Sequence, residues 1–193
     1  MRNKYTEAEI KVLLKNLCVI VDTREQVWSN IEEYLKKSNI LYRREKLSQG
    51  DYSICIISNE ETKPLGINRD LYFDNEIVIE RKASIDEVAG NMKEPDRTRL
   101  KKEFSYLKSR GVKVHFYLQD ENYDLNLRKG AYRSEYNLNI YIYPSITTIC
   151  TISNIKTCVI KFNYTNTWWN ISIIIICKLD YITFINLSFV PIF

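Results

Sequence analysis

Several features that would place a protein in a familiar class are missing from this sequence of 193 residues. Its five cysteines include no pair with CxxC spacing, so the pattern does not favour a zinc site. The first residues, Met1-Arg2-Asn3-Lys4, lead into a polar amphipathic stretch and not into the apolar segment of a secretory signal. We therefore expect a cytoplasmic protein. The single histidine, His115, alternates within an apolar run and is interpreted as a structural or surface residue.

Charge is unevenly distributed along the chain. Residues 1–137 hold 48 of the 52 charged residues, and residues 138–193 hold four. The formal net charge of +4 is modest for a nucleic-acid-binding protein and does not by itself demonstrate a basic surface. The change of composition predicts two parts, a globular domain over 1–137 and a tail over 138–193.

The tail contains 15 isoleucines in 56 residues and no Gly, Ala, Glu, Gln, Arg, His or Met. A membrane helix is disfavoured because Asn, Thr and Ser interrupt every apolar stretch before it reaches the roughly 20 residues that a span requires. A β-rich accessory domain suits the many β-branched residues, although turn residues are few and the segment looks prone to aggregation. Out-of-frame translation of AT-rich coding DNA accounts best for the composition. On either of the last two interpretations the tail is an irregular or aberrant segment.

Residues 1–137 alternate between helical and strand patterns. Helical periodicity, capping-box spacing at Ser29 and Ser84, and apolar runs rich in β-branched residues define the expected elements. The expected helices are near 10–17 and over 29–37, 84–92 and 96–109, and the expected strands cover 17–21, 41–47, 51–57, 76–82 and 112–118. This order predicts an α/β fold with a central mixed sheet flanked by helices.

The residues with the clearest chemical meaning lie at strand ends. Phosphodiester hydrolysis requires neutralisation of phosphate charge and an activated water, and carboxylates that hold Mg²⁺ supply both. Glu80 and Lys82 are two apart on an expected strand and share one face, while Arg81 points to the other. Asp51, which follows Gly50 on the preceding strand, can lie opposite them. An isolated Glu-x-Lys is a weak signal, since strands often end in charged residues.

Four motifs in order strengthen that signal. Gly50-Asp51 followed by Glu80-Arg81-Lys82-x-x-x-Asp86 resembles the GD…ERKxxxD signature of XPF-type structure-specific endonucleases. The segment Val21-Asp22-Thr23-Arg24-Glu25 resembles that family's first acidic motif, and Arg97-x-Arg99 with Glu103 resembles its later Arg-containing helix. The resemblance covers about residues 17–136, and it is closest to the minimal form of this domain met in bacteria and phages. It implies a restriction-endonuclease-like core.

The resemblance also implies roles for the carboxylates. Asp51 and Glu80 would be the principal ligands of Mg²⁺ or Mn²⁺. Asp22 would help to ligate the ion, and Glu25 would bind the ion or its waters. Asp22 has a plain alternative, since it could simply precede a helix.

The remaining motif residues would act around the phosphate. Lys82 would orient the attacking water or stabilise the phosphorane, and Arg81 and Asp86 would support the site. Arg97 and Lys82 would contact DNA, and Arg99 would contact phosphate or brace the strand of Glu80. Asp86 could equally serve the dipole of its helix, and the two arginines could form a solvated helix face.

The resemblance implies a metal-dependent DNA endonuclease acting on branched or flapped DNA in repair or recombination, with no membrane partner. A homodimer is an open alternative. A catalytically inactive DNA-binding or scaffold subunit of the same fold is the competing interpretation, and retention of Asp22, Asp51, Glu80 and Lys82 favours catalysis. A restriction-like enzyme would need a base-reading element, and none is visible. Tyr123, Tyr132 and Tyr136 could stack on bases or pack in the fold.

The interpretation of the tail is directly testable. If residues 138–193 are translated out of frame, one of the other two frames of the nucleotide sequence after codon 137 encodes a charged, amphipathic continuation. Sequencing the coding DNA checks this. Stop codons close behind codon 137 in both alternative frames would contradict it.

Overall fold

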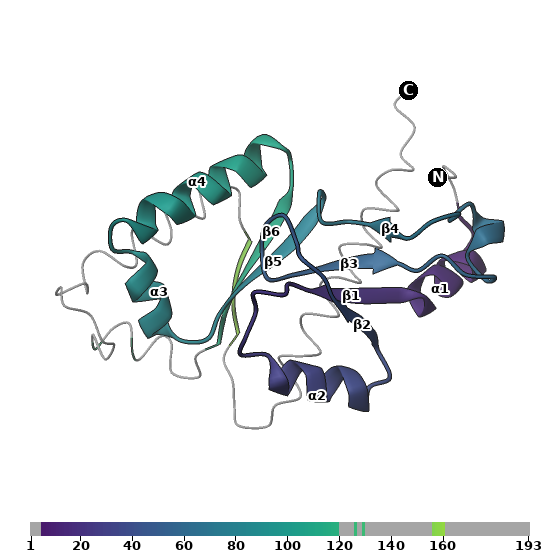
Figure 1. Ribbon diagram of the computed structural model, residues 1–193, viewed down its shortest axis with the longest axis horizontal. Coiled ribbons are helices and arrows are strands. Elements are labelled where there is room, and N and C mark those ends of the chain that lie inside the picture. The colour runs from purple at the N-terminus through teal and green to yellow at the C-terminus, as the bar shows by residue number, and fades with distance from the viewer. Residues whose placement is uncertain (1–4, 120–125, 127–128, 130–155, 161–193) are drawn as a thin grey trace. The chain divides into compact units, whose positions relative to one another are not determined.

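The computed structural model describes residues 5–119, 126, 129 and 156–160, and these fall into two compact units. Within the described residues, the first unit holds 5–47 and 52–74, and the second holds 48–51 and 75–160 with its gaps. Each unit combines strands and helices, as the α/β prediction requires (Figure 1). The Tyr123, Tyr132 and Tyr136 side chains lie outside the described residues.

The first unit is built around the buried strand β1. Its elements are α1 (Glu7–Lys15), β1 (Leu17–Val21), α2 (Ser29–Lys37), β2 (Leu41–Arg44), β3 (Tyr52–Ile56), a 3-10 turn η1 (Lys63–Leu65) and β4 (Leu71–Tyr72). Strand β1 pairs in parallel with β2 and antiparallel with β3, and β4 pairs antiparallel with the far end of β3. Every residue of β1 and β3 is buried, which explains why their sequences are apolar except at Ser53.

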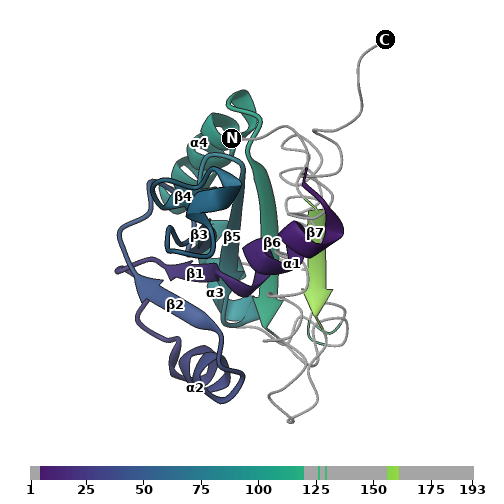
Figure 2. The ribbon, with the colours of Figure 1, turned by 90° about the vertical axis from the view of Figure 1, so that its right-hand side faces the viewer.

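The second unit carries the expected Glu-x-Lys strand. Its elements are β5 (Ile77–Lys82), α3 (Ile85–Asn91), α4 (Asp96–Ser109), β6 (Lys113–Gln119) and β7 (Lys156–Ile160). Strands β5, β6 and β7 lie side by side and are parallel (Figure 2). One core cluster joins the inner faces of α3 and α4 to Val78 of β5 and to Val114, Phe116 and Leu118, which alternate along β6.

Helix ends confirm one of the two predicted N-terminal caps and correct the other. Ser84 caps α3 by accepting a hydrogen bond from the Glu87 N–H, and Gly111 adopts φ +73° just past α4. The capping box expected at Ser29 is wrong. Trp28 is the N-cap residue there, without a side-chain cap, and Ser29 is already the first helical residue.

Most of the tail lies outside the described residues. The part described, 156–160, forms β7, which pairs in parallel with β6 from His115↔Lys156 to Gln119↔Ile160. Within the described residues no helix is long and apolar enough to cross a membrane.

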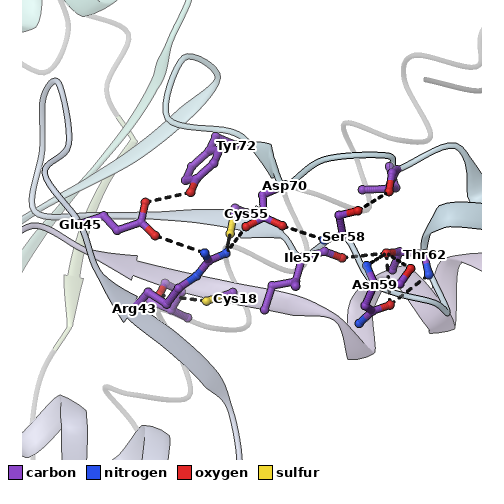
Figure 3. A network of polar contacts seen from close by, with 12 residues as sticks. Cys18, Arg43, Glu45, Cys55, Ile57, Ser58, Asn59, Thr62, Asp70 and Tyr72 are labelled. Carbon is purple, nitrogen blue, oxygen red and sulfur yellow. Dashed lines mark hydrogen bonds and ion pairs between the residues drawn. The ribbon is translucent and has the colours of Figure 1, made fainter.

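Arg43 on β2 is the centre of a polar network in the first unit (Figure 3). Its guanidinium donates to Asp70 at 2.7 Å and to the Cys55 Sγ at 3.3 Å, and it lies 3.4 Å from the Glu45 carboxylate. Cys55 is the register partner of Cys18, and both thiols are buried. The hydrogen bond from Cys55, against the effect of burial and with help from Arg43, lowers the pKa of the Cys18 thiol to about 7.

Replacing the cation tests this network. A Cys18 pKa below its ordinary value contributes stability that is present near pH 9 and is lost as pH falls through about 7, while the raised pKa of its partner Cys55 opposes it at still higher pH. Arg43→Met should therefore lower the free energy of unfolding by about 1–3 kcal/mol, and the loss should be larger at pH 9 than at pH 6. Urea denaturation at both pH values measures it. Lys37→Met, which removes an exposed i,i+4 ion pair, is the control. Equal losses in the two variants, independent of pH, would show that the network adds nothing.

Candidate active site

Strand β5 ends in three consecutive charged residues that are all buried. Glu80, Arg81 and Lys82 are 7%, 6% and 7% exposed. Charged side chains are seldom buried this deeply unless they are paired. Because successive strand residues alternate, Glu80 and Lys82 share one face and Arg81 lies on the other, as the sequence predicted.

Glu80 and Lys82 form a buried ion pair with 2.7 Å between the carboxylate Oε1 and the ammonium Nζ. Burial would lower the pKa of Lys82, but the Glu80 carboxylate, helped by Glu87 and Asp51, outweighs it and raises the pKa. Lys82 is therefore a cation at neutral pH. As a cation it can donate hydrogen bonds to phosphate oxygens but cannot act as a general base.

The Gly50-Asp51 turn brings a second carboxylate to this strand. The Asp51 N–H donates to the Ile79 carbonyl at 2.8 Å, and Asp51 Oδ2 accepts from the Arg81 N–H at 2.7 Å. Gly50 has φ +77°, and a Cβ added there would lie 2.9 Å from the Val78 Cβ. Only glycine permits this approach, which keeps Asp51 beside the end of β5.

Glu87 is a residue that the sequence interpretation did not assign to the site. Its carboxylate lies 3.4 Å from the Lys82 Nζ and accepts the Ala83 N–H at 2.8 Å. The signal was present, since Glu87 occupies the last position of the Ser84 capping box. Asp86, which had been assigned a supporting role, is exposed in the first turn of α3, where a carboxylate also suits the helix dipole.

Asp22 lies in the first unit, at the end of β1, and is 1% exposed. Its carboxylate accepts from the Arg24 side chain at 2.7 and 3.0 Å and from the Leu47 N–H at 2.7 Å. Burial alone would raise the pKa of Asp22, but these bonds and one from the Arg24 N–H outweigh it and lower the pKa. Glu25, by contrast, caps a local turn by accepting the Val27 N–H at 3.2 Å.

The two expected DNA contacts, Arg97 and Arg99, are exposed on α4. Arg99 lies 3.4 Å from Asp96 in a local i,i+3 pair with both side chains more than half exposed. Such a pair holds the arginine weakly. Both guanidinium groups are therefore accessible to a phosphate.

The oxygen-rich character of this site suits a hard divalent cation. Across the described ranges of the chain, no three His, Cys, Asp or Glu side chains converge closely enough to hold a metal ion by themselves. Mg²⁺ is commonly bound by one or two carboxylates together with waters and substrate phosphates. Asp51 and Glu80 meet that smaller requirement, so the donor set fits Mg²⁺ or Mn²⁺ in the presence of a phosphate.

Comparisons with known proteins bear on the fold and on the family. XPF from Aeropyrum pernix is similar in structure, with a TM-score of 0.55 and 15% identity over 85% of this chain and 65% of that chain. The structure of XPF from Aeropyrum pernix in complex with DNA gives a TM-score of 0.53 and 16% identity over 86% of this chain and 66% of that one. This chain thus spans slightly less than two thirds of either. No curated protein matches the sequence.

Those structural similarities, at such low identity, show the fold alone. They confirm the expected restriction-endonuclease-like core for the part of the chain that the structure describes. The sequence model of the ERCC4 domain matches residues 21–179, continuing past the change of composition at residue 137. Because that match covers most of the chain, the protein belongs to the ERCC4 domain family.

Proposed function

We propose that this protein is a divalent-metal-dependent DNA endonuclease that hydrolyses phosphodiester bonds in branched or flapped DNA. The observation that carries the proposal is the buried Glu80–Lys82 ion pair at the end of β5. The Asp51 carboxylate accepts a hydrogen bond from the backbone of the same strand end. A strand that only supported the fold would be at least as stable with apolar residues at these buried positions. Membership of the ERCC4 domain family supports the same conclusion.

Asp51 and Glu80 are the proposed principal metal ligands. When bound, the cation would lower the pKa of a coordinated water and offset charge on the scissile phosphate. Both carboxylates are already oriented by partners of their own chain, Asp51 by the Arg81 N–H and Glu80 by Lys82. The cationic Lys82 would stabilise negative charge on the phosphate as the attacking water adds.

Asp22 and Glu25 are proposed as additional ligands of the ion or its waters. The low pKa of Asp22 keeps it ionised, which a ligand role needs. Asp86 is proposed to support the strand end from the first turn of α3, and the buried Arg81 does so from within β5.

DNA is the proposed partner, bound in part by Arg97 and Arg99. Helix α4 carries five lysines and arginines against two acidic residues, and both arginines are exposed. A structure of XPF from Aeropyrum pernix in complex with DNA supports this partner by analogy. A role in repair or recombination, a cytoplasmic location and formation of a homodimer are proposed on the family resemblance alone.

An inactive scaffold is the second candidate function, and one observation favours it. In the described part of the chain, Asp22 and Glu80 already have internal cationic partners and no three potential ligands converge. In that case the buried charges would be structural. The two candidates differ in whether removing a carboxylate changes cleavage.

Neutral, isosteric replacements separate the candidates. Asp51→Asn keeps an oxygen that can accept the Arg81 N–H, and Glu80→Gln keeps one that can accept from Lys82. Each should lower Mg²⁺-dependent cleavage of a flap substrate by at least about 100-fold, since each removes ligand charge, while DNA binding changes by less than about threefold. Cleavage assays on flap, fork, junction and plain duplex DNA, with filter binding in Ca²⁺, provide the measurement.

A control variant and two contrary outcomes complete the comparison of nuclease and scaffold. Lys37→Met on α2, a change far from the motif in sequence, should cleave normally. Unchanged cleavage in both carboxylate variants would refute the ligand assignment, and an inactive wild-type chain that still binds DNA would favour the scaffold.

Asp22 has a stability effect that must be separated from its proposed role as a ligand. Asp22→Asn places an amide NH₂ against N–H donors and should cost about 1–3 kcal/mol of unfolding free energy at pH 7. A carboxyl with a lowered pKa contributes stability above its unfolded pKa of about 3.9, and this is lost as pH falls further. The deficit should therefore shrink below about pH 4. Urea denaturation at pH 7 and 3.5 tests this, with Glu60→Gln, 91% exposed, as the control. A deficit that stays constant with pH would rule out an ionised Asp22 as its source.

A further inference from the structure

Helix α4 packs on β6, on the face of the sheet that carries the proposed catalytic residues of β5. Val78, Glu80 and Lys82 alternate along β5 and therefore share one face. Val78 belongs to the same core cluster as Phe104 of α4. Phe116 on β6 is the register partner of Glu80, and its ring packs edge-on against Phe104 with centroids 6.3 Å apart.

Glu103 immediately precedes Phe104 and is half-buried at the edge of this packed surface. Its carboxylate accepts a backbone hydrogen bond from Gly50. Burial raises the pKa of Glu103, and the nearby Glu80 carboxylate raises it further. Glu103 is thus bonded to the Gly50 turn and lies near enough to Glu80 for the two carboxylates to interact.

The Gly50-Asp51 turn forms hydrogen bonds with two different elements. Strand β5 holds Asp51 through the Ile79 carbonyl and the Arg81 N–H. The Gly50 N–H is bound by Glu103, which belongs to α4 and not to the strand. Glu103 therefore connects α4, which packs in the core, to the backbone of the turn.

We propose that Glu103 is a positioning residue, which holds the Gly50 amide and thereby fixes the Asp51 carboxylate relative to Glu80. This inference rests on the nuclease function proposed above. Glu103 acts through the backbone of Gly50, so what it must supply is a hydrogen-bond acceptor at that position. A negative charge is not required for this role.

Two substitutions distinguish an acceptor from a charge. Glu103→Gln retains a carbonyl oxygen for the Gly50 N–H, whereas Glu103→Ala removes it. We expect Glu103→Ala to lower kcat for flap cleavage by about 10–100-fold and to raise the Mg²⁺ concentration for half-maximal activity, with KM for DNA little changed. Glu103→Gln should stay within about threefold of wild type. Glu33→Ala and Glu33→Gln on the exposed face of α2 make the same changes in another helix and should behave as wild type.

Amide hydrogen exchange of the full chain, followed by NMR, tests positioning without reference to activity. The Gly50 and Asp51 amides should exchange at least about 10-fold faster in Glu103→Ala than in wild type or Glu103→Gln, at equal global stability. If the wild-type chain does not cleave DNA but this exchange pattern holds, the nuclease proposal fails and the contact itself stands.

Two outcomes would overturn the inference. Equal loss of cleavage in Glu103→Gln and Glu103→Ala, with unchanged exchange at Gly50, would make the charge of Glu103 the active property, as for a direct metal ligand. Wild-type cleavage and exchange in both variants would show that the contact has no role.

Discussion

The buried ion pair between Glu80 and Lys82 is the constraint on which the rest of the second unit depends. Two charges removed from water cost several kcal/mol each unless their geometry and hydrogen bonding compensate, and a hydrophobic pair would do as well for stability. The 2.7 Å contact and the raised pKa of Lys82 show that this pair is compensated within the chain. Two further carboxylates contribute to this compensation. Glu87 lies near Lys82 on α3, and Asp51 contributes its charge from the turn before β5.

The glycine before Asp51 is the second constraint, and it is one of backbone geometry. Asp51 can reach the Arg81 N–H only if the chain ahead of it passes within van der Waals contact of Val78, at a positive φ. A side chain at position 50 would clash with Val78 and would also be strained by the positive φ. The Gly-Asp order in the sequence is therefore explained by the packing of a turn on a strand as well as by the chemistry of the aspartate.

The parts of the structure that were predictable from sequence are those governed by local rules. The apolar runs of β1 and β5, the Ser84 cap and the shared face of Glu80 and Lys82 all follow from periodicity and capping chemistry. The capping box predicted at Ser29 does not form because Trp28 already occupies the N-cap position. Trp28 packs edge-on against Tyr42 with ring centroids 5.7 Å apart, so tertiary packing overrode the local signal. The partners of Asp22 and Glu103 could not be predicted, since the Leu47 and Gly50 amides are distant in sequence. A contact of that kind leaves no periodic signature.

The local charge balance argues for a cation as part of the function. Asp51, Glu80, Glu87 and Glu103 place four carboxylates within electrostatic range of Lys82, and Arg99 is a second cation near Glu103. Such an acidic excess repels the phosphates of DNA, so a surface that served only to bind DNA would gain from neutral or basic residues here. Burial and the Glu80 carboxylate both raise the pKa of Glu103, although Arg99 and Lys82 act in the opposite direction. A divalent cation would relieve that repulsion and attract a phosphate at once, and this double effect favours a metal-dependent nuclease over a scaffold.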